Sequence, residues 1–155
     1  MRPIKLAQHM KANADRMAEG LMQKIRKSDR CGDLVLKVPE DEHKRYSLEI
    51  YQDLTDWLAN ETDSILEGRY IATGARRAQQ GVPLSNMFWA TCITRDYLWD
   101  YIQQECLLDE QVDFWGGVIL LRSLNQFFDR AMYWALVGYQ KAGKETVAGA
   151  PAVSA

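Results

Sequence analysis

The sequence has few prolines and cysteines and no long apolar run. Its three cysteines form no Cys-x-x-Cys motif, so the sequence indicates neither a disulfide framework nor a zinc knuckle. No stretch approaches the ~18 consecutive apolar residues of a membrane span, and no signal peptide opens the chain. Long segments also lack a helix breaker, because the prolines of the 155 residues are only Pro3, Pro39, Pro83 and Pro151.

An excess of charge of one sign is also missing. Nineteen Lys and Arg residues stand against 21 Asp and Glu residues, which gives a formal net charge of −2. A nucleic-acid-binding protein normally shows a basic patch or stripe, so this balance argues against one. The length suits one domain with a proper core. Together these features predict a cytoplasmic single-domain protein that binds neither nucleic acid nor a membrane.

Apolar residues recur at helical spacing between the prolines, and no alternating β-branched run competes with them. The pattern predicts an all-α fold, a single up-down bundle of about five helices with a long C-terminal helix. The predicted helices run over about Ile4–Lys27, from just after Pro39 through Leu58, from a cap at Asn60 or Thr62 to Gly81, from an N-cap at Ser85 to about Leu107, and from an N-cap at Asp109 to about Lys141.

Three local features qualify this reading. Residues 28–39 form a connector in which Leu34, Leu36 and Val38 alternate with other residues, which is compatible with a short extended piece. A break in the long last helix is expected at Gly116-Gly117. The Gly- and Ala-rich segment from Ala142 onward predicts a flexible tail over residues 142–155, after a helical domain over residues 1–141.

Two arginines fall on the apolar faces of their predicted helices. Arg77 shares a face with Tyr70, and Arg95 lies among apolar residues near Trp99. A buried guanidinium needs partners, so these arginines either pair with internal carboxylates or line a pocket for a small anionic ligand. Asp129 on the last helix is a candidate partner, although it also fits a solvated stripe. The candidate ligand-binding cluster comprises Arg77, Arg95, Asp129, His43, Tyr70 and Trp99.

His43 lies on the apolar face of the second predicted helix, where it is either a haem or metal ligand or a structural histidine bonded to a neighbouring group. Glu40 and His43 spell Glu-x-x-His, half of the pair that di-iron bundles use, but His9 has Leu6 three positions before it. Cys92 suits a small buried hydrophobe better than a reactive thiol. The sequence therefore predicts no catalytic residue, no metal site and no cofactor.

Several segments resemble a known family. Residues 74–84 read Gly-Ala-Arg-Arg-Ala-Gln-Gln-Gly-Val-Pro-Leu and are followed by Arg95 and Leu98-Trp99, while residues 126–133 read Gln-Phe-Phe-Asp-Arg-Ala-Met-Tyr before Gly138-Tyr139. In these features the chain resembles the RsbRD-type N-terminal domain over about residues 4–141. That resemblance implies an all-helical sensory or regulatory module, which precedes output domains in bacterial stress-response co-antagonists and some sensor histidine kinases.

The resemblance implies a non-enzymatic signal-input module whose last helix leads into an effector. Its expected partners are a kinase or a stress-response regulator, and a small anionic ligand is a further candidate. Only a short tail follows Lys141, so the chain is either a stand-alone module with non-covalent partners or part of a longer protein. Two alternatives stay open: a haem- or metal-binding sensor that uses His43, and a bundle that forms homodimers through the outer face of the last helix.

Overall fold

The computed structural model describes residues 3–60, 62–104 and 114–149, and within them the chain is all-α. The described elements are α1 (Pro3–Lys27), the short 3-10 helix η1 (Asp29–Cys31), α2 (Gly32–Lys37), α3 (Glu40–Asn60), α4 (Asp63–Gln79), α5 (Leu84–Gln104) and α6 (Phe114–Gly149). The predicted fold class is confirmed. The sixth helix arises because the expected connector contains α2.

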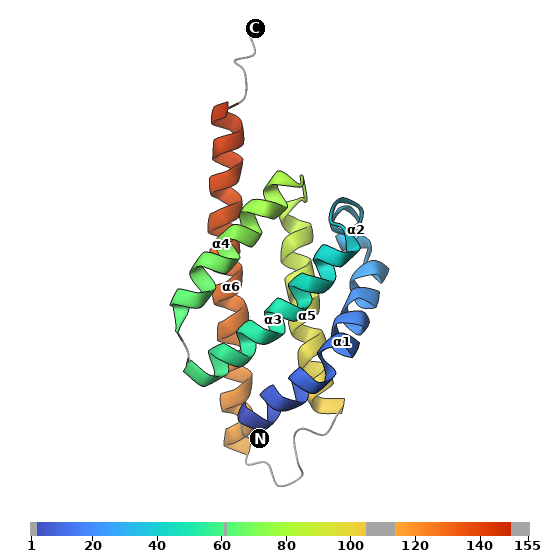
Figure 1. Ribbon diagram of the computed structural model, residues 1–155, viewed down its shortest axis with the longest axis vertical. Coiled ribbons are helices and arrows are strands. Elements are labelled where there is room, and N and C mark those ends of the chain that lie inside the picture. Colours follow the sequence, from blue (N-terminus) through green and yellow to red (C-terminus); the bar gives the residue numbers. More distant parts are fainter. Residues whose placement is uncertain (1–2, 61, 105–113, 150–155) are drawn as a thin grey trace, which may run out of the picture.

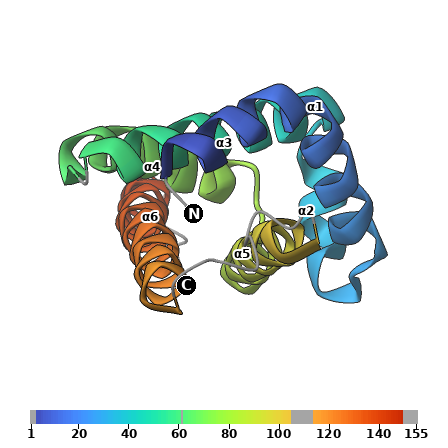
Figure 2. The same cartoon turned by 90° about the horizontal axis from the view of Figure 1, so that it is seen from below.

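The long helices alternate in direction and form a bundle (Figure 1). Seen from below, α1, α3 and α4 lie along one side, and α5 and α6 lie opposite them (Figure 2). The main core fills the space between these layers. Its completely buried side chains include Leu6 and Met17 from α1, Leu54 from α3 and Phe127 from α6. All four belong to segments for which the sequence predicts helices.

The expected extended piece at Leu34, Leu36 and Val38 is wrong, because this segment is helical. Leu34 and Val38 are four residues apart and both are buried, whereas Leu36 is 84% exposed. The Val38 N–H donates to the Leu34 carbonyl at 3.1 Å and closes α2. Four-residue spacing places both side chains on one helical face, so they join a small second core with Leu21, Ile25, Cys31 and Val82.

The junction between α4 and α5 follows the prediction at Gly81 and departs from it at Ser85. Gly81 has φ of 74°, a left-handed conformation that glycine adopts without a Cβ penalty, and it follows the end of α4. The Pro83 carbonyl accepts hydrogen bonds from the N–H groups of Asn86 and Met87 at 3.0 and 3.2 Å. The helix therefore begins at Leu84. Pro83 occupies the N-cap position, two residues before Ser85, which the sequence predicted as the N-cap.

The last helix is longer at its C-terminal end than predicted. It passes through Gly116-Gly117 without interruption, so the expected break is wrong, and it continues past Lys141 to Gly149. Its last turns project beyond the other helices (Figure 1). The predicted cap Asp109, and Cys106 and Leu107 at the predicted end of the preceding helix, lie outside the described residues.

Helices α4 and α6 approach each other closely at two glycines. A Cβ built on Gly74 would lie less than 3.0 Å from backbone atoms of Ala135, including its carbonyl oxygen. A Cβ on Gly138 would lie equally close to the backbone of Ile71. The contact is reciprocal, since each helix offers a glycine to the backbone of the other. The two helices therefore pack backbone against backbone, and this packing fixes the position of α4 on α6.

Gly74→Ala should lower the free energy of unfolding by about 2–3 kcal/mol, because the added methyl group would meet backbone atoms that cannot rotate away. The matched control is Gly68→Ala in the same helix, where a Cβ has no atom within 4 Å. The control should raise stability by about 0.5–1 kcal/mol, since alanine is the better helix former. Urea denaturation measures both values. Equal effects at the two positions would contradict the close packing.

Candidate functional site

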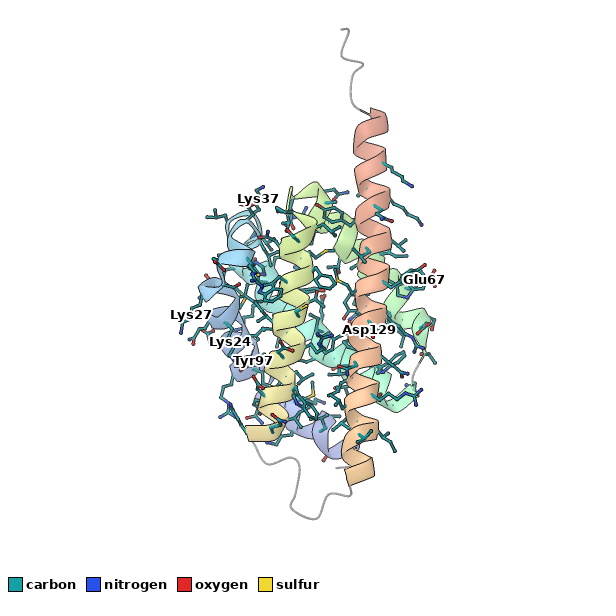
Figure 3. The ribbon with its side chains drawn as sticks, turned by 180° about the vertical axis from the view of Figure 1, so that it is seen from behind. Lys24, Lys27, Lys37, Glu67, Tyr97 and Asp129 are labelled. Carbon is teal, nitrogen blue, oxygen red and sulfur yellow. The ribbon has the colours of Figure 1, made fainter. Side chains whose placement is uncertain are left out.

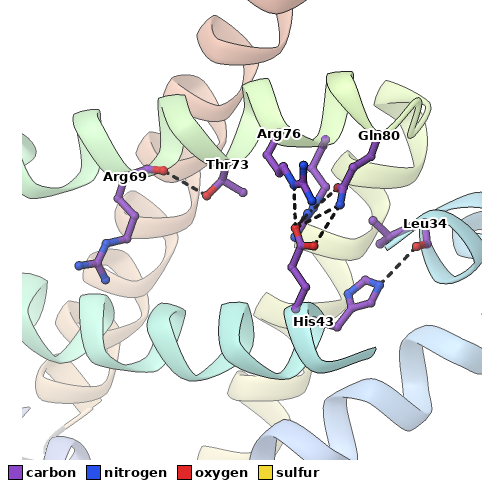
Figure 4. A network of polar contacts seen from close by, with 8 residues as sticks. Leu34, His43, Arg69, Thr73, Arg76 and Gln80 are labelled. Carbon is purple, nitrogen blue, oxygen red and sulfur yellow. Dashed lines mark hydrogen bonds and ion pairs between the residues drawn. The ribbon is translucent and has the colours of Figure 1, made fainter. Parts of the chain in front are cut away.

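A buried arginine joins the end of α4 to the first turn of α3. The Arg77 Nη1 donates to Glu42 Oε1 at 2.8 Å and to Gln80 Oε1 at 2.7 Å, and Gln80 Nε2 donates to both Glu42 carboxylate oxygens at 3.2 and 3.1 Å. Each member of this triad therefore bonds the other two. Arg76 adds a contact from its Nε to Glu42 Oε1 at 3.3 Å (Figure 4).

The triad is mostly shielded from water. Arg77 is 4% exposed, and its guanidinium carbon lies 5.3 Å from the centre of the Tyr46 ring, close enough for a cation–π interaction. Partial burial tends to raise the pKa of the Glu42 carboxyl, but the hydrogen bonds and charges of Arg77 and Arg76 outweigh it and hold that pKa below its usual value. Glu42 therefore stays ionised and keeps Arg77 in place.

A second polar bridge joins the C-terminal half of α3 to the N-terminal half of α4. Asp53 is 1% exposed, forms an ion pair with Arg69 and accepts a hydrogen bond from the Tyr70 hydroxyl at 3.0 Å. Burial raises the pKa of Asp53 to about 6, although the positive charge of Arg69 and the bond from Tyr70 oppose this shift. Long side chains rather than close backbone packing thus hold α3 and α4 together.

A groove of about 550 Å³ lies between the two polar bridges. Four arginines and two glutamates line it, and Tyr46, Ile65 and Ala72 add apolar surface. Figure 4 shows Arg76 and Gln80 reaching from the C-terminal end of α4 toward the start of α3, with Arg69 nearer the N-terminus of α4. The groove is open to solvent and its lining is mostly polar. The charged lining residues are Glu42, Arg45, Glu49, Arg69, Arg76 and Arg77.

The structure does not gather all the predicted site residues. Arg95 on α5 is 38% exposed rather than buried, and its contact within the described part of the chain is with Asp96 at 3.9 Å. Trp99 packs against the main core. Asp129 is exposed on α6 (Figure 3), so the expected pairing of Asp129 with Arg77 or Arg95 is wrong. Arg77 finds its carboxylate in Glu42 instead, because Glu42 faces it across the groove end.

His43 is buried and makes the structural contact that the sequence left as one alternative. Its Nε2 lies 3.3 Å from the Leu34 carbonyl oxygen, which accepts a hydrogen bond when this nitrogen carries the proton. Burial lowers the pKa of His43, and the bond to Leu34 opposes this shift. No group of three or more His, Cys, Asp or Glu side chains within residues 3–60, 62–104 and 114–149 is placed to hold a metal ion.

The comparison with protein families identifies the chain. The family model described as the RsbT co-antagonist protein rsbRD N-terminal domain matches residues 12–150, which is most of the sequence. The chain belongs to this family. The family is a regulatory one of the stress response, which agrees with the regulatory role that the resemblance implies. No curated protein and no solved structure matches the chain significantly. None of the described helices is both long and apolar enough to cross a membrane.

Sequence reasoning missed most of the groove in this RsbRD N-terminal domain. Neither Glu42 nor Asp53 is among the site residues that the sequence predicts. A signal was present, because Glu42, Tyr46, Glu49 and Asp53 recur at steps of three and four residues along α3. Such spacing places them on one helical face, beside the apolar face that enters the core. A polar stripe so close to a core face indicates a charged neighbouring helix.

Arg77→Ala should destabilise the domain by about 3 kcal/mol, because Glu42 and Gln80 would lose the buried cation that joins them. The adjacent Arg76→Ala is the matched control. The Arg76 side chain is 56% exposed, so its loss should cost below about 1 kcal/mol. Thermal unfolding followed by circular dichroism compares the two variants. If Arg77→Ala lowers the free energy of unfolding no more than Arg76→Ala does, the buried Arg77–Glu42 pair does not stabilise the domain.

Ionisation of Asp53 should weaken the fold as pH rises. Its pKa is about 6 in the folded protein against 3.8 for the ordinary carboxyl, so the folded state holds the proton more tightly. Stability from this proton is present below about pH 4 and lost by about pH 6, amounting to about 3 kcal/mol. Asp53→Asn should remove this part of the pH dependence.

Urea unfolding between pH 4 and pH 7 measures the difference between wild type and Asp53→Asn. The control is Asp100→Asn at an exposed position on α5, which should keep the wild-type dependence because Asp100 is not among the charges that shift the pKa of Asp53. A parallel pH dependence of wild type and Asp53→Asn would contradict the raised pKa.

Proposed function

We propose that the chain is a signal-input module of a cytoplasmic bacterial stress-response pathway, in which binding in the α3–α4 groove moves α4 and thereby α6. The regulatory character of the RsbRD N-terminal domain family supports the general role. The output partner is a protein, a kinase or a stress-response regulator that reads the position of α6. The input is a small anionic ligand, for which the arginines of the groove supply the positive charge.

The observation that carries this proposal is the unequal attachment of α4 to its two neighbours. Helix α4 meets α6 through backbone contacts at Gly74 and Gly138, where even a Cβ would meet the backbone of the other helix. It meets α3 through the Glu42–Arg77 and Asp53–Arg69 bridges, whose side chains can change partners. A ligand that binds the groove conformations unequally therefore shifts α4 relative to α3, and α6 follows α4.

The Tyr139 hydroxyl strengthens this link. It donates a hydrogen bond of 2.6 Å to the Val82 carbonyl, in the segment that follows α4. The same segment is held from the other side by Lys37, whose Nζ donates to the Gly81 carbonyl at 2.8 Å. A displacement of the end of α4 would therefore strain the hydrogen bonds that link this segment to α6 and to α2.

Glu42→Gln tests the transmission without any ligand, because it removes the charge that holds Arg77. Amide hydrogen exchange followed by mass spectrometry should become at least several-fold faster at the end of α4 and in α6 around Gly138. The exchange of α1 should stay unchanged. Exchange reports local opening, so it follows the coupling along the chain.

Glu40→Gln is the matched control. Glu40 also lies in the first turn of α3, but it is 76% exposed and pairs with Arg26 of α1. Both substitutions remove one negative charge from the same helix end, so a common helix-dipole effect cancels between them. The proposal fails if Glu42→Gln leaves α6 unaffected, or if Glu40→Gln produces the same change in α6.

A further inference from the structure

We infer that the α3–α4 groove binds a small molecule carrying a phosphate monoester, with the phosphate held between Arg45 of α3 and Arg76 of α4. This inference names the ligand class of the groove and rests on its proposed role as the input site. Both arginines line the groove, and they belong to the two helices whose relative position the proposed function requires to change.

The two arginines have donors to spare. Arg45 is exposed and has no hydrogen-bond or ion-pair partner among the residues that the structure describes. Arg76 uses its Nε for Glu42, at 3.3 Å, and its two terminal nitrogens have no such partner in the described part of the chain. Arg77 and Arg69, in contrast, are engaged by Glu42 and Asp53. The free donors of Arg45 and Arg76 are therefore the groups that would bind an oxyanion.

The two guanidinium groups with spare donors favour a dianion. Glu42 pairs with Arg77 and Asp53 pairs with Arg69, which leaves the charges of Arg45 and Arg76 for a ligand, and a phosphate monoester carries about −1.5 to −2 at neutral pH. Three terminal oxygens let one phosphate accept hydrogen bonds from guanidinium groups on both helices. Glu42 and Glu49 would repel a continuous polyanion such as a nucleic acid, because they interrupt the row of arginines.

The groove also has room for an organic group beside the phosphate. Its volume of about 550 Å³ exceeds what an inorganic ion fills, and Tyr46, Ile65 and Ala72 supply apolar surface. Phosphate bound between Arg45 and the terminal nitrogens of Arg76 would add a new link between α3 and α4, so occupancy of the groove changes how the two helices are joined.

Phenyl phosphate is a suitable probe, because it joins a phosphate monoester to an apolar ring. Isothermal titration of the full chain at low ionic strength should detect its binding. Arg45→Gln should weaken that binding at least tenfold, and it should fold normally because Arg45 is exposed. The control Arg122→Gln removes the same charge from an exposed position on α6 and should leave binding unchanged.

Two further titrations separate the ligand classes. Inorganic phosphate should bind more weakly than phenyl phosphate, since it lacks the apolar group, and the dicarboxylate phthalate should bind more weakly because each carboxylate carries one charge. The inference is overturned if wild type binds no phenyl phosphate at millimolar concentration, if Arg45→Gln binds it as wild type does, or if phthalate binds as tightly. The exchange experiment on Glu42→Gln uses no ligand, so the proposed function can survive such a result.

Discussion

The close contact of α4 with α6 is the constraint on which the rest of the structure depends. Gly74 and Gly138 each receive the backbone of the other helix, so the two helices pack at a distance that no larger side chain at these positions would allow. Every group that α4 carries is therefore placed relative to α6. Arg77 reaches Glu42 from this fixed helix, and its burial beside Tyr46 follows from the position of the helix.

The interface between α3 and α4 is of a different kind. It depends on charged and hydroxyl groups at the ends of long side chains, with Glu42 and Asp53 as the two anionic centres. Such contacts have alternative partners in water or in a ligand, whereas the apolar core has none. The domain thus combines one rigid helix pair with one adjustable boundary, and this combination suits a regulatory domain of the RsbRD family.

The sequence predicts the all-α bundle and most helix limits, because helical periodicity and the position of Gly81 are local signals. It also places Arg77 on a core face. It does not reveal that Glu42 is the partner, since the pair is distant in the chain and depends on how α3 crosses α4. Arg95 has the same pattern but is only partly covered, because a long side chain can leave an apolar face in the folded structure. The close contact of α4 with α6 at Gly74 could not be predicted from the sequence, because the only local feature there is the glycine itself.

The projection of α6 beyond the other helices has a mechanical consequence. From Gly138, where α6 is clamped, to Gly149 the helix extends about 16 Å at 1.5 Å per residue. If α4 and α6 tilt together by about 10°, the tip of this arm moves through about 3 Å by simple trigonometry from that length. A small change in the orientation of the helix pair thus becomes a larger displacement at the end of α6.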